Sequence, residues 1–275
     1  MQHTRFIFSP SLAQPYPLFL ESIGHHEDQE QRVRPEGYPY YHWLHTFSGE
    51  GEIELGGSRF RLPRGTGVLL LPGVAHTYAA VTEPWCTQYV TFGGNCAQPI
   101  LSTLDMQESA MYNWEDESPL YHAVNRLLAP LIEERAGYTE YDRSADLFHF
   151  LIAIKKYAQR NNRTSVSHHM LQLQPLIDWL EERYANPDTG IREMAAMLQV
   201  TPRHLNTLFQ HAFGLSPYAY LIMLRLRKAK ELLLSDREQP IRLVAGRVGF
   251  RDLSHFTASF RKRVGLTPDR FRQIH

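Results

Sequence analysis

The chain has 275 residues, with 29 Lys and Arg against 29 Asp and Glu, and 43% of its residues are hydrophobic. These numbers exclude a globally disordered or collagen-like chain and suggest about two domains of roughly 100–200 residues each. No apolar run reaches the roughly 18 residues of a membrane span, the N-terminus lacks a signal pattern, and two cysteines are too few for a disulfide framework. We therefore expect a cytoplasmic protein.

The net charge of zero conceals an uneven distribution along the chain. Residues 171–275 carry 16 Lys and Arg against 10 Asp and Glu, a net charge of +6, whereas the rest of the chain carries 13 against 19, a net charge of −6. Such an asymmetry is typical of a nucleic-acid-binding half joined to a half with another task. Two ordinary domains with uneven surfaces would give the same numbers, so both interpretations stay open at this point.

Residues 32–95 have the pattern of many short strands separated by Gly and Pro turns. The segment 38–47 is rich in aromatic residues, and the segments 52–55 and 59–62 alternate around Gly56-Gly57, which is a hairpin signal. Short strands at this spacing predict a β-barrel or jelly roll.

From about residue 118 the hydrophobic period changes from 2 to 3.6, which predicts helices. The first apolar stripe consists of Leu120, Val124, Leu127, Leu128 and Leu131. The second consists of Leu147, Leu151, Ile154 and Ala158. Gly137-Tyr138-Thr139 lies between them as a break, so we expect a helical hairpin, followed by a polar linker.

The helical C-terminal part contains an internal repeat. Ile191-Arg-Glu-Met-Ala195 and Ile241-Arg-Leu-Val-Ala245 match at an offset of 50, and Gly214-Leu-Ser-Pro217 and Gly265-Leu-Thr-Pro268 match at an offset of 51. One extra residue is therefore expected in the turn of the second copy, around Gly249-Phe250. Each copy predicts a helix, a short turn, a second helix and a Gly-Leu-Ser/Thr-Pro end.

Each copy has the properties of a helix-turn-helix unit. Thr201 and Asp252 are placed to cap the second helix of their copies, and Ala195 and Ala245 are small where two helices must approach closely. In the first copy, the outward positions would be filled by Arg203, Asn206, Thr207 and Gln210, which we take as DNA-contacting residues. In the second copy we assign this role to Arg251, Ser254, Thr257, Arg261 and Lys262, of which the Arg and Lys would hold phosphates.

A helix is predicted between the copies, with Ser216 as its cap. Its 19 residues would span about 28 Å, close to the roughly 34 Å between successive major grooves on one face of DNA. Four basic residues on this helix are expected either to contact phosphates or to form a solvated face: Arg225, Arg227, Lys228 and Lys230.

The second copy carries a longer pattern, which runs Ile241-x-x-x-Ala245-x-x-Val248-Gly249-Phe250-x-Asp252-x-Ser254-x-Phe256-x-x-x-Phe260-Arg261-Lys262-x-x-Gly265-x-Thr267-Pro268. This pattern resembles the AraC/XylS family of bacterial transcription regulators over about the last 100 residues. The resemblance implies seven helices that carry two helix-turn-helix units in one monomer. His255 stands where an aromatic residue is usual.

The N-terminal half also resembles the cupin-like sensor domain of this family. The matching segments are Arg34-Pro-Glu-Gly37, Gly49-Glu-Gly51, Pro72-Gly-Val-Ala-His76-Thr-Tyr78 and Trp85-x-x-Gln88-Tyr89-Val90-x-Phe92. The resemblance implies a small-sugar pocket, for which we take five ligand-binding candidates: Arg34, His76, Tyr78, Thr87 and Tyr89. The arabinose-responsive founder has His in place of Thr87 and Trp in place of Tyr89, so the effector is expected to differ from arabinose.

A metal-dependent cupin enzyme, or a metal sensor, fused to a DNA-binding domain is the alternative. His42, His45 and His76 are candidate ligands, but His42 and His45 are three residues apart and would face opposite sides of a strand. We therefore expect no metal site, no cofactor, no catalytic residues and no enzyme activity.

The expected fold class is α+β. The boundaries are a cupin-like β-barrel or jelly-roll sensor with an N-terminal arm at 1–105, a dimerising helical hairpin at 106–160, a linker at 161–170 and an all-α double helix-turn-helix domain at 171–275. The expected partners are double-stranded promoter or operator DNA, a small carbohydrate effector, a second copy of the chain and RNA polymerase. No membrane partner is expected.

Overall fold

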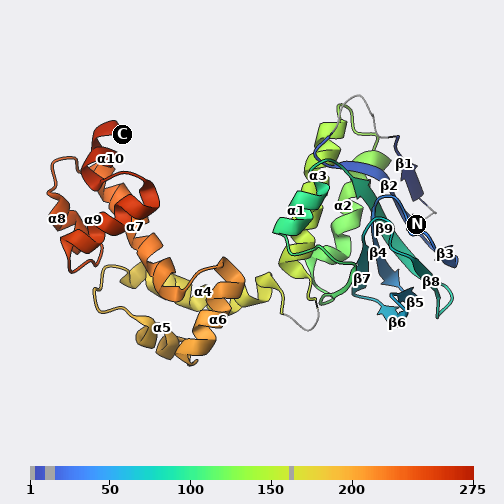
Figure 1. The fold of residues 1–275 in the computed structure, drawn as a ribbon, viewed down its shortest axis with the longest axis horizontal. Helices are drawn as coiled ribbons and strands as arrows, with labels where there is room; N and C mark the ends of the chain where they lie inside the picture. The colour runs from blue at the N-terminus through green and yellow to red at the C-terminus, as the bar shows by residue number, and fades with distance from the viewer. Residues whose placement is uncertain (1–3, 10–15, 161–163) are drawn as a thin grey trace. The chain divides into compact units, whose positions relative to one another are not determined.

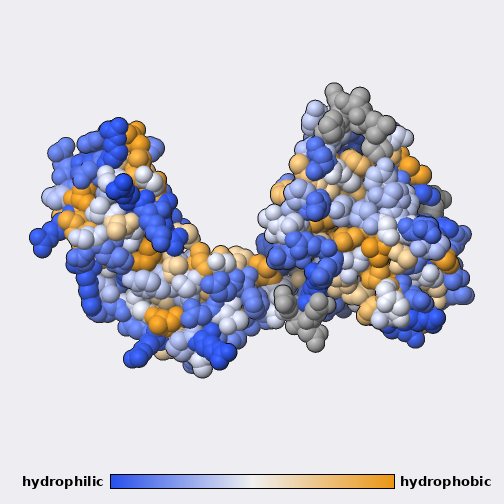
Figure 2. All heavy atoms as spheres, in the orientation of Figure 1, coloured by the Kyte–Doolittle hydropathy of each residue, from blue (hydrophilic) through white to orange (hydrophobic). Residues whose placement is uncertain are grey.

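The computed structural model describes residues 4–9, 16–160 and 164–275, and it divides into two compact units, 1–165 and 166–275 (Figure 1). In both units the surface facing the viewer is largely hydrophilic, with hydrophobic patches scattered over it (Figure 2). Within the described ranges, no helix is long and apolar enough to cross a membrane.

The first unit contains two antiparallel sheets that face each other. The six-stranded sheet has the order β1 (Thr4–Ile7), β2 (Phe19–His26), β9 (Cys86–Gly93), β4 (Tyr41–Ser48), β7 (Thr66–Leu70) and β10 (Ala110–Asn113). The four-stranded sheet has the order β3 (Arg32–Arg34), β8 (His76–Ala80), β5 (Glu50–Leu55) and β6 (Ser58–Pro63). Buried residues of both sheets, such as Leu44 and Ile53, pack into one cluster between them. The predicted barrel or jelly roll is confirmed.

The β5–β6 hairpin follows from its turn residues. Gly56 and Gly57 have φ angles of 58° and 76°, and Leu55 pairs with Ser58 across the turn. A two-residue turn with positive φ at both positions matches the twist of antiparallel strands, and glycine adopts this conformation without steric cost. This pair therefore fixes the register of an edge of the smaller sheet.

Helices cover the outer face of the six-stranded sheet (Figure 1). They are α1 (Ala97–Thr103), the 3₁₀ helix η1 (Pro119–His122), α2 (Ala123–Ile132) and α3 (Glu140–Tyr157). Side chains alternate along β4, so that Trp43 packs under these helices while Leu44 points between the sheets. The predicted helical hairpin is therefore part of the sensor unit, and β10, which lies inside the range 106–160, pairs with β7.

The apolar stripe that begins at Leu120 of η1 and continues along α2 packs inward. Leu120 and Leu127 are each only 2% exposed, in a core shared with Leu151 of α3. They have no surface left for a second subunit, so a dimer interface on this hairpin would need other side chains. The exposed apolar side chains of α3 are instead Tyr141, Phe148 and Ile152, which are 69%, 41% and 37% exposed.

Two segments between or before the domains are more ordered than the sequence predicts. The expected N-terminal arm contains β1, which pairs with β2, whereas residues 10–15 of that arm lie outside the described residues. The expected linker at 161–170 is helical from Val166 onward, where α4 begins. His169 of this helix is buried, and its ring lies beside that of His211. Residues 161–163 are not among the described residues.

The second unit is all helical. Its elements are α4 (Val166–Arg183), α5 (Ile191–Met197), α6 (Pro202–Phe213), α7 (Pro217–Ser235), α8 (Ile241–Arg247), α9 (Leu253–Val264) and α10 (Pro268–Ile274). Two apolar cores form, one around α4, α5 and α6 and the other around α8, α9 and α10. Helix α7 has the predicted 19 residues and contributes Leu221 to the first core and Leu226 to the second.

The repeat is built by matching helix caps. Thr201 accepts a hydrogen bond from the His204 N–H at 3.2 Å, and Asp252 accepts one from the His255 N–H at 2.7 Å. Helices α6 and α9 both end at a glycine in the left-handed region. Four residues separate α5 from α6 and five separate α8 from α9, so the extra residue lies in the predicted turn.

Candidate ligand site and nucleic-acid interface

Polar side chains from four strands meet between the two sheets. Arg34 ends β3, His42 lies on β4, His76 begins β8 and Tyr89 lies on β9. His42, His76 and Tyr89 are 3%, 4% and 6% exposed, and Tyr78 belongs to the same buried cluster as Tyr89. Gly24 of β2 makes room for this packing, since a Cβ there would lie 2.8 Å from the Tyr89 hydroxyl. The barrel interior therefore contains charged and polar groups as well as aliphatic ones.

Arg34 and His76 are neighbours across the β3–β8 pair. The Arg34 guanidinium lies 4.6 Å from the centre of the Tyr38 ring, and the His76 ring stacks on Tyr78 at 6.0 Å. His76 Nδ1 is 2.7 Å from the carbonyl oxygen of Val74. Because a carbonyl can only accept, Nδ1 is the protonated nitrogen and Nε2 of the neutral ring is left as an acceptor.

His42 lies deepest in this cluster. Its Nδ1 is 2.9 Å from Thr91 Oγ1, and its ring centre is 5.8 Å from that of Tyr89. Burial lowers the pKa of His42 well below the ordinary value, and the nearby Arg34 and His76 lower it further. Burial likewise raises the pKa of Tyr89 to about 12. Both side chains are therefore neutral hydrogen-bonding groups at neutral pH.

Among the described residues, four buried polar atoms of this cluster have no hydrogen-bond partner. They are Arg34 Nη1, His42 Nε2, His76 Nε2 and the Tyr89 hydroxyl. Buried polar groups are normally satisfied, because an unmet donor or acceptor costs about 1–3 kcal/mol. A polar molecule that reached these atoms would satisfy them.

The structure brings together most of the predicted ligand-binding residues. Arg34, His76, Tyr78 and Tyr89 belong to this cluster, whereas the buried Thr87 hydroxyl donates to Gln29 Oε1 at 2.8 Å and is engaged by the protein itself. Sequence reasoning missed two members. These are Tyr38, under the Arg34 guanidinium, and His26, whose ring lies 5.3 Å from Tyr89.

His42 and His45, two of the three candidate metal ligands, lie on opposite sides of β4, as their spacing predicts. His42 points between the sheets, whereas His45 lies under the helices and accepts a hydrogen bond from Trp43 Nε1 at 3.1 Å. In the ranges that the structure describes, no three His, Cys, Asp or Glu side chains are arranged to hold a metal ion.

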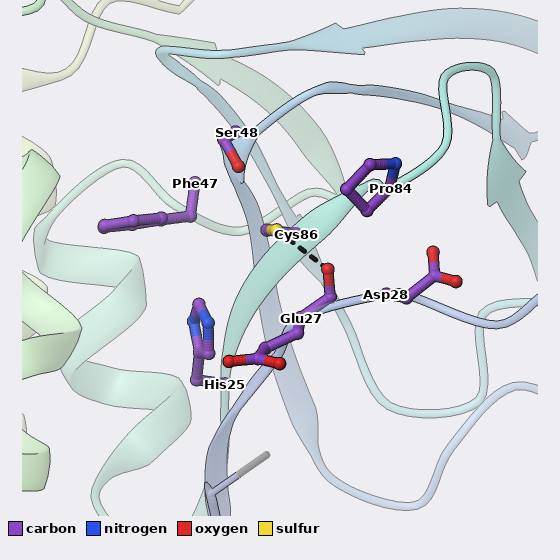
Figure 3. A pocket seen from close by; sticks show the side chains of 7 residues that line it. All are labelled: His25, Glu27, Asp28, Phe47, Ser48, Pro84 and Cys86. Carbon is purple, nitrogen blue, oxygen red and sulfur yellow. Dashed lines mark hydrogen bonds between the residues drawn. The ribbon is translucent and has the colours of Figure 1, made fainter. Parts of the chain in front are cut away.

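A separate hollow of about 620 Å³ opens where β2 and β4 end and β9 begins (Figure 3). Its lining consists of His25, Glu27, Asp28, Phe47, Ser48, Pro84 and Cys86. The Cys86 thiol donates to the Glu27 carbonyl at 2.8 Å, and His25 packs edge-on against Phe47. None of the predicted ligand residues lines this hollow, so it is distinct from the polar cluster of the barrel interior.

Helix α6 presents a polar face to solvent. Its buried residues are Leu205, Leu208 and Phe209. The opposite positions are exposed and hold all four residues predicted to contact DNA there: Arg203, Asn206, Thr207 and Gln210. Asn206 and Thr207 also hydrogen-bond to carbonyls one turn earlier, which holds their side chains along the helix.

Helix α9 presents shorter side chains. Its surface hollow is lined by Leu253, Ser254, Thr257, Ala258, Arg261, Lys262 and Thr267, which include four of the predicted contacts. Ser254, Arg261 and Lys262 are exposed and Thr257 is half-buried. Arg251, the fifth predicted contact, forms an exposed ion pair with Asp188.

One arginine of α7 has a role that the sequence did not indicate. Arg225 is 3% exposed and donates to the carbonyls of Tyr184 and Asn186 at 2.8 and 2.7 Å. Its guanidinium also lies 5.8 Å from the centre of the Phe250 ring in the turn of the second unit. Arg225 is therefore neither a phosphate contact nor part of a solvated face. Arg227 is exposed and Lys228 is half-buried, and both pair with Glu181.

Comparisons with known proteins find family matches in both units. Residues 19–151 match an AraC-like ligand binding domain, and residues 194–274 match a helix-turn-helix domain. The chain is 24% identical over 267 residues to the MmsAB operon regulatory protein of Pseudomonas aeruginosa, an alignment that covers 93% of this chain and 83% of that protein. It is 26% identical over 262 residues to the HTH-type transcriptional activator RhaS of Escherichia coli, covering 89% and 91%.

Among solved structures, the DNA-binding domain of AdpA in complex with a target DNA is similar at 26% identity and a TM-score of 0.36. It covers 38% of this chain and 91% of that one.

Proposed function

The chain belongs to the AraC/XylS family of transcription regulators, and from this premise we propose that a small molecule held in its barrel controls sequence-specific DNA binding by α6 and α9. The observation that carries this proposal is the pair of capped helices, each with an exposed polar face, in one positively charged unit. A protein with a DNA partner would act in the cytoplasm.

Base reading is assigned mainly to α6. Arg203 can make paired hydrogen bonds with guanine, and Asn206 and Gln210 carry amides that suit adenine. On α9 the corresponding residues Ser254 and Thr257 are short, so this helix would add affinity more than base specificity. Arg261 and Lys262 would hold phosphates, as would Arg251 if DNA replaces its partner Asp188.

Selection of binding sites from random duplexes tests this assignment. The Arg203→Ala variant is expected to bind its best site about 5- to 150-fold more weakly, a cost of about 1–3 kcal/mol, and to lose preference at one base position. Arg126→Ala removes the same charge from an exposed position of the sensor unit and serves as the control. Equal weakening on every sequence would contradict base reading by Arg203.

The effector is proposed to be a small hydroxylated molecule of the carbohydrate class. Tyr78 and Tyr89 offer ring faces for a sugar, and the buried atoms of Arg34, His42 and His76 offer hydrogen bonds to its hydroxyls. Binding would change transcription only if one arrangement of the protein holds the effector more tightly than another. RNA polymerase would then be the next partner at the promoter.

A homodimer is proposed through the exposed face of α3. Tyr141, Phe148 and Ile152 recur at helical spacing on that face and are 69%, 41% and 37% exposed. Apolar side chains that recur on one helix face favour helix–helix association between subunits.

The metal-enzyme alternative is disfavoured by the opposite orientations of His42 and His45. The barrel is proposed to act as a sensor without catalytic activity. Metal analysis of the purified protein tests this choice, because stoichiometric metal that is lost on His42→Ala or His76→Ala substitution would support the alternative.

A further inference from the structure

Resting on the proposed sensor role of the barrel, we propose that the effector is a hydroxy acid or sugar acid whose carboxylate pairs with Arg34 and whose hydroxyl binds His76. Such an effector belongs to the anionic, carboxylated members of the carbohydrate class.

Arg34 has no carboxylate partner of its own in the part of the chain that the structure describes. Glu52 lies 3.8 Å from Arg59, and Glu21 accepts hydrogen bonds from Tyr38 and from Ser22 at 3.1 and 2.7 Å. The neighbouring Arg32 is paired with Glu30. Among the described residues, Arg34 Nη1 at the end of β3 is therefore buried and has no hydrogen-bond partner.

A guanidinium in this position favours an anion over a neutral molecule. Arg presents paired N–H groups that match the two oxygens of a carboxylate, and such charge-assisted bonds are about twice as strong as neutral ones. The surroundings strengthen this preference, because Tyr78 and Tyr89 are buried and charge-assisted bonds are stronger where the local dielectric constant is low. A neutral sugar would leave the positive charge uncompensated.

The neighbouring groups specify a hydroxyl beside the carboxylate. His76 lies directly across the strand pair from Arg34, and its Nε2 is an unpartnered acceptor because Nδ1–H is used by the Val74 carbonyl. Burial and Arg34 lower the pKa of His76, which keeps this lone pair available at neutral pH. The Tyr89 hydroxyl can donate to or accept from a second hydroxyl of the effector.

The charge of the cluster favours a carboxylate over a phosphate. Arg34 supplies one positive charge, whereas His42 and His76 are kept neutral by burial. A phosphate group carries close to two charges at neutral pH and would need a second cation. One guanidinium therefore matches the single charge of a carboxylate.

Matched pairs of compounds test the proposal by thermal shift on the full-length protein. The probes are gluconate against glucitol, glucuronate against glucose, galacturonate against galactose, and glucose 6-phosphate. We expect at least one acid to raise the melting temperature in a saturable way and to bind at least tenfold more tightly than its neutral partner. Arg34→Gln should remove this preference, and Arg34→Lys should keep part of it.

The control is Arg59→Gln, which removes one exposed positive charge from the same sheet. Selection of DNA sites with the Arg34 variants shows whether they fold. Equal binding of acids and neutral partners, acid preference that survives in Arg34→Gln, preferential binding of the phosphate, or no response to any acid would each overturn the proposal. A neutral sugar that binds alone would leave the sensor role intact, whereas failure to select any DNA site would refute the proposed function independently.

Discussion

Acidification is expected to destabilise the sensor unit through His45. This side chain is 1% exposed, and its Nδ1 accepts a hydrogen bond from Trp43 Nε1 while its ring meets Trp114 edge-on at 5.7 Å. Burial lowers the pKa of His45 from 6.5 to about 3. Protonation would add a charge in an apolar core and replace the acceptor of Trp43 by a donor, so the folded protein resists it.

The size of the effect follows from the two pKa values. The unfolded chain takes up a proton near pH 6.5 and the folded chain does so only near pH 3, so stability is fully present above pH 6.5 and is lost as the pH falls below it. Each pH unit in that window costs about 1.4 kcal/mol. Between pH 7 and pH 5, His45 alone should therefore remove about 2 kcal/mol from the free energy of unfolding.

Urea titrations followed by tryptophan fluorescence at several pH values measure this loss. His45→Asn keeps an acceptor for Trp43 but cannot titrate, so its stability should fall by about 2 kcal/mol less than that of the wild type between pH 7 and pH 5. His122→Asn, at an exposed position, is the matched control and should retain the wild-type pH dependence. A His45→Asn variant with an unchanged pH dependence would refute the assignment of acid sensitivity to this histidine.

Three further outcomes are expected. Phe148→Asp combined with Ile152→Asp should yield monomers in sedimentation experiments, whereas the exposed His149→Asp should leave the dimer intact; a monomeric wild type at micromolar concentration would contradict the interface. Arg261→Ala should reduce the slope of log affinity against log salt by about 0.9 if it holds one phosphate, and an unchanged slope would exclude that contact. Arg225→Met should lower the free energy of unfolding, measured in urea, by about 2–4 kcal/mol because the carbonyls of Tyr184 and Asn186 lose a charged donor. A loss below about 1 kcal/mol would show that these hydrogen bonds do not stabilise the fold.

The helix-turn-helix repeat could be predicted in detail because its determinants are local. Thr201 and Asp252 cap helices three residues away, and Gly214 and Gly265 end them in a conformation that suits glycine. Capping residues and terminal glycines can be identified from the sequence because they act within a few residues, and their repetition in two copies strengthens the prediction. The positions of the recognition faces followed from the helical period alone.

Features that depend on distant contacts could not be predicted in the same way. Arg225 looks like a surface residue in the sequence, but its carbonyl partners lie about 40 residues earlier in the chain. Likewise β10 is a strand of four residues that is defined by its pairing with β7, which comes much earlier in the chain. The barrel cluster was predicted in part, because alternation along a strand selects a face but does not say which hydroxyl, such as that of Thr87, is already engaged.

The construction of α7 explains how two unequal recognition helices can serve one binding site. Its side chains fill both cores, with Leu221 in the first and Leu226 and Leu233 in the second, and Arg225 donates hydrogen bonds to the carbonyls of Tyr184 and Asn186 beside the Phe250 ring. A shared helix of this kind resists separate movement of the two helix-turn-helix copies, since any tilt would open both cores at once. Base reading by α6 would therefore also fix where α9 meets the DNA backbone, and α9 can contribute affinity through its basic residues without reading many bases itself.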